Sequence, residues 1–186
     1  ETEHATSTVA VAIIPNVALS AAGGVVIDGV SVLLPSGVPS PQSASCAVAC
    51  GRNAIVQVPA TRWDVHTQAA LPEPIASRVR HAGFVTGADL ADNAAFAVSP
   101  AETAAMDPCQ RLLLERGYAA LHIAQQDRAA LGGSLTGVFL GFAGTEFAQV
   151  LAASPAGGSV YAATGANVSI AAGRLSYTLG LHGPCV

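Results

Sequence analysis

The stretch Met106–His122, MDPCQRLLLERGYAALH, predicts a long buried helix. Asp107 is a common N-cap residue, Pro108 suits the first helical position, and Gln110 stands where a capping box places Glu or Gln. Apolar residues then recur at the spacing of one helix face, with charged residues between them. The predicted buried face contains Leu113, Leu114, Gly117, Leu121 and Ala124, and the predicted solvent face contains Arg111, Glu115 and Arg116.

Two further helices have clear end signals. Ser99, Pro100 and Glu102 repeat the capping pattern and predict a short helix over 99–105 that meets the long helix at a corner. The segment 167–179 predicts a final helix, and Gly180 suits its C-terminal stop.

Two apolar runs predict buried strands, VVIDGVSVLL at 25–34 and TGVFLGF at 136–142. Strands that alternate with helices indicate an α/β fold. Two strands do not make a stable sheet, so we expect the others from the irregular stretches, from beyond Val186 or from a second chain. Weaker signals predict a small-residue, weakly held helix from Ser40 to near Gly51, an extended piece at 54–58, loops at 65–80 and 154–159, irregular structure with a short strand within 81–98, and a short helix at 146–152.

The composition favours a chain that contacts other proteins. Hydrophobic residues make up 51% and charged residues only 11%, which leaves little charge for an independent surface. All eight basic residues are arginine and the net charge is −4, so the chain offers no basic patch for nucleic acid. We therefore expect protein partners and no nucleic acid.

The four cysteines predict no metal centre. Cys46, Cys50, Cys109 and Cys185 form no CxxC pair, and HExxH is absent. We interpret all four as small buried thiols, and His81 and His122 as surface or cap residues. The sequence thus predicts no metal and no cofactor.

The first 24 residues predict an arm that is mobile or extended on a partner. The mostly apolar stretch Val9–Leu34 has no basic flank, so we expect no membrane span. It is interrupted by Pro15, Asn16, Ser20, Gly23, Gly24 and Asp28. The chain begins at Glu1, which indicates a processed, truncated or partial polypeptide. The predicted location is intracellular, within an organelle if a presequence was removed.

A series of motifs in order resembles a known family. These are Leu34–Val38 with Ser40 and Pro41, Gly51–Ile55, Val58 and Pro59 with Arg62–Asp64, Val98–Ala104, Met106–Glu115, Gly133–Gly141, and Ser169–Tyr177 followed by Gly180, Leu181, Gly183 and Pro184. Together they resemble the N-terminal part of β-ketoacyl synthases, the ketosynthase domains of modular polyketide synthases. The resemblance implies a thiolase-like layered α/β fold, of which residues 25–186 are an incomplete N-terminal half.

The chain departs from the family pattern at several positions. Ala44 and Ser45 replace a Phe-Trp pair, Val32 and Leu33 replace Cys-Arg, Cys109 replaces a Gln and Ala95 replaces a Phe. Loss of buried aromatic residues costs on the order of 3–5 kcal/mol each without repacking. Either a partner refills the space beside the first helix or that helix drifts. The changes at Cys109 and Ala95 indicate relaxed packing constraints.

The resemblance also implies that the reacting groups lie outside these residues. The family's Asp-Thr-Ala-Cys-Ser-Ser nucleophile motif would begin just after Val186, and its two histidines and lysine follow later. Cys185 and Cys109 are interpreted as structural, so no catalytic residue is predicted within the chain.

Two functions remain open. One is a fragment or split half of a ketosynthase, which when complete condenses acyl and malonyl thioesters on a carrier protein with loss of carbon dioxide. The other is a non-catalytic, ketosynthase-derived structural subunit of a larger protein assembly, such as one in an organelle. Both predict that this chain alone is inactive.

Overall fold

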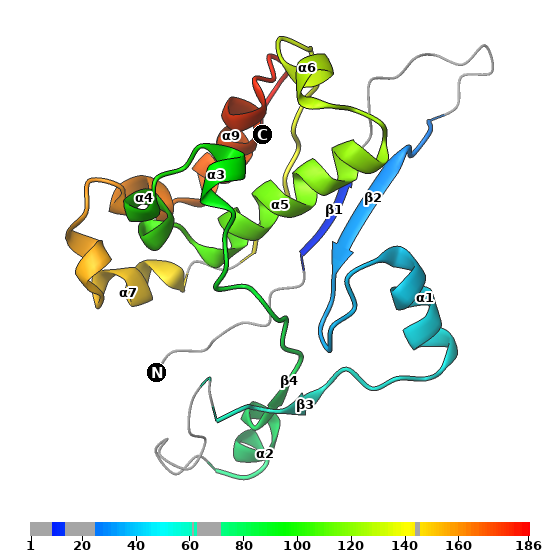
Figure 1. Cartoon of the computed structure of the whole chain (residues 1–186). Coiled ribbons are helices and arrows are strands. Elements are labelled where there is room, and N and C mark those ends of the chain that lie inside the picture. The colour runs from blue at the N-terminus through cyan, green and yellow to red at the C-terminus, as the bar shows by residue number, and fades with distance from the viewer. Residues whose placement is uncertain (1–8, 14–24, 61, 63–71, 144–145) are drawn as a thin grey trace.

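The computed structural model describes residues 9–13, 25–60, 62, 72–143 and 146–186, and places the helix α5 (Pro108–Ile123) at the centre of the main body (Figure 1). Asp107 caps α5 by accepting a hydrogen bond from the Cys109 N–H at 2.7 Å, and Pro108 starts the helix. The predicted start of α5 is confirmed. Its buried residues are Gln110, Leu112, Leu113, Leu114, Gly117, Ala120 and Leu121.

An antiparallel hairpin lies on one side of α5. Its strands are β1 (Val9–Ile13) and β2 (Gly29–Leu33), with Val9 opposite Leu33 and Ile13 opposite Gly29. Both strands contact α5 (Figure 1). β1 falls within the predicted N-terminal arm and pairs with this chain's own β2, whereas the remaining arm residues, 1–8 and 14–24, lie outside the described residues.

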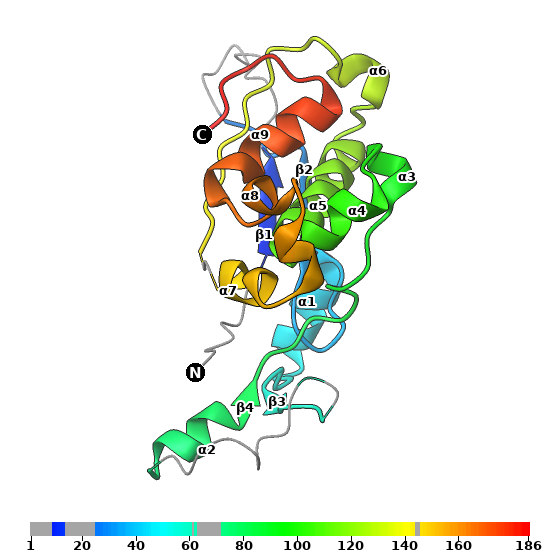
Figure 2. The ribbon, with the colours of Figure 1, turned by 90° about the vertical axis from the view of Figure 1, so that its left-hand side faces the viewer.

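Helices cover the other side of α5. They are α4 (Pro100–Ala105), α8 (Ala162–Gly165) and α9 (Val168–Leu179), which gather beside α5 in the turned view (Figure 2). The α4 and α9 predictions are confirmed, including the Ser99 N-cap and the left-handed Gly180 at the end of α9. The core between these elements contains Phe96, Met106, Leu114, Leu121, Leu131, Leu175, Leu179 and Leu181.

A second group of elements extends away from the main body (Figure 1). It contains α1 (Pro41–Ala49), β3 (Val56–Gln57), α2 (Ile75–Val79) and β4 (His81–Ala82), and β3 pairs with β4 in antiparallel register. No residue of α1 is buried, as its small side chains predicted. The short elements that complete the described fold are α3 (Asn93–Phe96), α6 (Arg128–Leu131), α7 (Phe147–Ala152) and the 3-10 helix η1 (Pro155–Gly158).

Both strand predictions were too long. Val25, Val26 and Ile27 are exposed and outside β2. The segment 136–142 has only an isolated parallel bridge, Val138 with Cys185, and Phe139 is 74% exposed. Two hydrogen bonds hold this bridge. The Val138 N–H donates to the Pro184 carbonyl at 2.8 Å, and the Val186 N–H donates to the Val138 carbonyl at 2.9 Å. A single neighbour on one side leaves Phe139 exposed, whereas Val138 packs against the core.

Several short helices were missed. The predicted loop at 65–80 contains α2, the irregular stretch contains α3, and η1 lies in the predicted loop at 154–159. Each has four or five residues, so no helical period is visible in the sequence.

Among the described residues no helix is both long and apolar enough to cross a membrane.

The predicted solvent face of α5 was also wrong. Arg111, Glu115 and Arg116 are half-buried, because the helix is covered from two sides rather than one. Gly117 allows α9 to approach α5 closely, because a Cβ at this position would lie 2.9 Å from a methyl carbon of Leu175.

Gly29→Ala should destabilise the protein, because the added methyl group would lie 2.1 Å from the Ala120 carbonyl oxygen of α5. Overpacking of this kind costs about 1–3 kcal/mol. Urea unfolding followed by circular dichroism measures the loss. Gly141→Ala is the matched control, since nothing lies within 4 Å of a Cβ at that position. Equal stability of the two variants would contradict the close packing of β2 on α5.

Candidate functional site

A buried polar network joins four helices on one side of α5. The Arg174 guanidinium of α9 donates to Gln110 Oε1 from Nε at 3.1 Å and pairs with the Glu102 carboxylate through Nη1. The Arg174 side chain is only 10% exposed and that of Glu102 is 25% exposed. A charge at this depth needs its partner, because an unpaired ion is costly to bury.

Gln110 continues the network toward α8. Its Nε2 donates to the carbonyl oxygens of Thr164, at 3.3 Å, and Asn167, at 3.1 Å. The side chain is 2% exposed, so all of its polar atoms are satisfied inside the protein. The predicted capping-box role of Gln110 is therefore wrong: the amide connects α5 to α8 and α9 instead.

Asp107 links the N-terminus of α5 to α8. Its N–H donates to the Gly165 carbonyl at 2.9 Å, and a Cβ at Gly165 would lie 1.8 Å from the Ala105 carbonyl oxygen. Burial raises the pKa of the Asp107 carboxyl above its usual value, although the hydrogen bond from Cys109 and the charge of Arg111 oppose this shift. A glycine at 165 is thus required for the backbone contact that buries Asp107.

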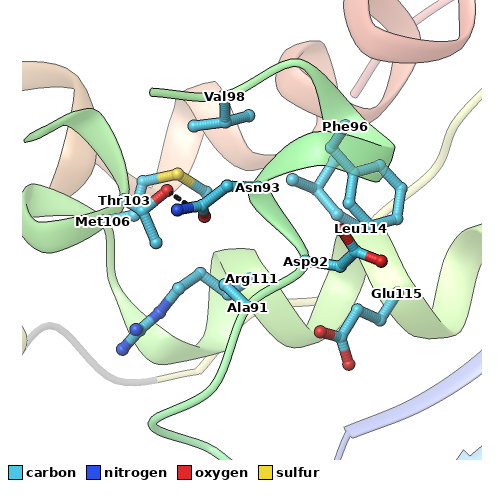
Figure 3. A pocket seen from close by; sticks show the side chains of 10 residues that line it. All are labelled: Ala91, Asp92, Asn93, Phe96, Val98, Thr103, Met106, Arg111, Leu114 and Glu115. Atoms are coloured by element: carbon cyan, nitrogen blue, oxygen red, sulfur yellow. Dashed lines mark hydrogen bonds between the residues drawn. The ribbon is translucent and has the colours of Figure 1, made fainter. Parts of the chain in front are cut away.

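A small cavity lies between α3 and α5 (Figure 3). Its volume is about 10 Å³, roughly enough for one water molecule. Thr103 Oγ1 donates to Asn93 Oδ1 at 2.7 Å across its rim. Arg111 Nη1 donates to the Asp89 carbonyl at 3.2 Å, and burial lowers the pKa of Arg111. A space of this size has no room for a substrate. The cavity is lined by Ala91, Asp92, Asn93, Phe96, Val98, Thr103, Met106, Arg111, Leu114 and Glu115.

The prediction that all four cysteines are buried was wrong. Cys46, Cys50 and Cys185 are exposed, Cys109 is half-buried, and none of the four is in a disulfide. Cys46 lies on α1 and Cys50 is its C-cap residue, and this helix packs against too little to cover them. Cys185 lies in the bridged C-terminal segment. His81 and His122 are both exposed, as expected.

The described residues form no candidate metal centre. Within 9–13, 25–60, 62, 72–143 and 146–186, no three His, Cys, Asp or Glu side chains lie close enough to share a metal ion. The sequence analysis missed the network of Glu102, Gln110 and Arg174. The only sign of this network in the sequence is that Arg174 lies between Ala171 and Leu175, which are buried positions of one helix face.

A family model matches most of the chain. The model describes the N-terminal domain of β-ketoacyl synthases and matches residues 22–186. This match covers every described helix and strand except β1.

Curated proteins similar to the chain are modular polyketide synthases. The spectinabilin polyketide synthase system protein NorC of Streptomyces orinoci is 42% identical over 158 residues, 82% of this chain and 7% of that protein. Polyketide synthase GfsB of Streptomyces halstedii is 43% identical over 168 residues, 87% of this chain and 3% of that protein. The pikromycin polyketide synthase component PikAII of Streptomyces venezuelae is 42% identical over 166 residues, 87% of this chain and 4% of that protein. The chain thus spans a small part of these relatives.

Solved structures similar to the chain are ketosynthase domains. A ketosynthase from module 6 of the bacillaene synthase of Bacillus subtilis 168 aligns with a TM-score of 0.71 and 27% identity, over 95% of this chain and 26% of that one. The oxazolomycin ketosynthase domain of Streptomyces albus aligns with a TM-score of 0.66 and 26% identity, over 87% of this chain and 28% of that one. The fold is therefore the N-terminal part of the thiolase-like ketosynthase fold.

Arg174→Met should lower the free energy of unfolding by about 3 kcal/mol, because it leaves Glu102 and Gln110 without their shared partner. Urea unfolding measures the change. Arg80→Met is the matched control: its pair with Glu73 spans 3.8 Å between side chains that are 44% and 64% exposed, so we expect a loss below about 1 kcal/mol. Similar losses for both variants would show that the network contributes no more than a surface pair.

The stability of the Asp107→Asn variant relative to the natural protein should rise as the pH increases from 3 to 7. The raised pKa means that the folded state holds the Asp107 proton more tightly than the unfolded state, so this group's contribution to stability falls as pH passes through the folded pKa. Asn keeps the cap and does not titrate. Unfolding measured at both pH values tests the sign, and a variant that becomes relatively less stable toward pH 7 would contradict the burial effect.

Proposed function

The chain belongs to the β-ketoacyl synthase family as a polyketide-type N-terminal domain, and from this membership we propose that its 186 residues provide the framework of a condensing domain, with the reacting thiol elsewhere in the polypeptide. The complete domain would join an acyl thioester to a malonyl-type extender unit on a carrier protein and release carbon dioxide. The carrier protein and its thioesters are therefore the proposed partners of the whole domain.

The observation that carries this proposal is the match of residues 22–186 to the N-terminal domain of β-ketoacyl synthases. Acyl transfer needs an activated thiolate, and decarboxylative condensation needs donors aimed at the developing oxyanion and enolate. The described part of the chain gathers no three His, Cys, Asp or Glu side chains that could share an ion. Cys185 pairs through its backbone with Val138, and Cys109 lies in the capped first turn of α5.

Exposed apolar side chains support a framework that is covered by further protein. Leu135, Phe139 and Val186 are each about three-quarters exposed, and they flank the parallel bridge between residues 138 and 185. A parallel strand pair of this kind is normally buried on both faces. The same surface would also suit the second candidate, a non-catalytic structural subunit, so the experiment must separate the two.

Acyl loading of the native polypeptide that contains these residues tests the proposal. Incubation with a simple acyl thioester, followed by proteolysis and mass spectrometry, should place the acyl group on a cysteine outside residues 1–186. The four cysteines within the chain should stay unmodified. Acylation of one of these four with turnover would overturn the proposal, and a native polypeptide that forms no acyl adduct at all would favour the structural subunit.

A further inference from the structure

Cys46 in α1 and Cys50, the C-cap residue of that helix, present two thiols at the helix C-terminus. They are four residues apart, and the Cys50 N–H donates to the Cys46 carbonyl at 2.9 Å, so the helical turn that connects them is closed. Side chains with this spacing are neighbours, with Cβ atoms about 5–6 Å apart. Both residues are exposed and neither is in a disulfide. The pair is therefore accessible from solvent.

No other part of the described structure uses these thiols. None of the residues of α1 is buried, and its first and last turns contain no acidic or basic side chain. The polar groups at the start of the helix are occupied in the capping box of Ser40 and Ser43. Packing, which is the usual reason for a cysteine in a helix, does not account for this pair among the residues that the structure describes.

The surroundings restrict which ligand the pair could hold. Zinc in structural sites takes four ligands, and calcium and magnesium take six or more oxygen ligands. The described residues supply no third His, Cys, Asp or Glu at this place. A disulfide needs Cβ atoms about 3.5–4.5 Å apart, closer than an intact helical turn provides. Two sulfur ligands without a third suit a soft ion that accepts twofold coordination.

We propose that Cys46 and Cys50 form a two-thiolate site for a soft cation of the Cu(I) class. Metal–sulfur bonds of roughly 2.3 Å, as in zinc thiolates, let one ion span the gap between two such side chains. Soft thiolate ligands select Cu(I) over harder ions. Two S–H bonds break, two Cu–S bonds form, both protons pass to solvent, and copper stays Cu(I), so no oxidant or reductant is needed.

Binding at this pair would stabilise α1 itself. The helix has nine residues and lacks buried anchors, so its last turn should open readily. An ion held by both ends of that turn favours the helical state, because metal affinity adds to the stability of the structure that forms the site. This role is independent of the proposed condensing function and does not require it.

Competition with a coloured Cu(I) chelator tests the site, on the reduced native polypeptide without oxygen and with Cu(I) as the only added ion. Cys46→Ser and Cys50→Ser should each weaken binding of one Cu(I) at least tenfold. Cys109→Ser and Cys185→Ser are matched controls and should change nothing. Both test positions are exposed on a helix without buried residues, so the serine variants should fold.

Hydrogen exchange gives a second readout. Cu(I) should slow exchange of the amides in residues 42–50 in the natural protein and not in either serine variant. Unchanged Cu(I) affinity in Cys46→Ser or Cys50→Ser would overturn the proposal. So would equal losses in the Cys109→Ser or Cys185→Ser controls. A parallel titration with Zn²⁺ as the only added ion that showed binding as tight as that of Cu(I) would also overturn it.

Discussion

The packing of the main body depends on how closely the neighbouring elements approach α5. β2 reaches the helix backbone at Gly29, where a methyl group would meet the Ala120 carbonyl, and α9 packs Leu175 onto Gly117 on another side. Because both approaches need a missing side chain, α5 can be shared by a hairpin and a helical layer at once. This sharing buries α5 on more than one face and makes its N-terminus the meeting point of α4, α8 and α9.

The sequence predicts the parts of this arrangement that have local causes. The starts of α4 and α5 follow from Ser99 and Asp107, which cap their own helices, and the end of α9 follows from Gly180 in a left-handed conformation. The Arg174 to Gln110 contact could not be predicted in this way, since its partners are 64 residues apart and meet only after α9 packs on α5. The predicted strand lengths were wrong for a related reason, because an apolar run becomes a strand only where a neighbour pairs with it.

Two of the departures from the family sequence, Ala44 and Ser45, lie in α1. Ala44 and Ser45 offer no large side chain, none of the helix is buried, and Cys46 and Cys50 are left in solvent. In the polar network of the main body, by contrast, Gln110 is almost wholly buried. The chain therefore joins a tightly packed helical body to a peripheral helix with little to hold it.

The most direct test of the central role of α5 is native-state hydrogen exchange resolved along the whole chain. Amides are protected according to the free energy needed to open them, so the interior of a shared helix should exchange last. The structure predicts the slowest exchange at Leu112–Leu121, with α9 next and α1 among the fastest of the described helices. Exchange in α5 as fast as in α1 would contradict the account.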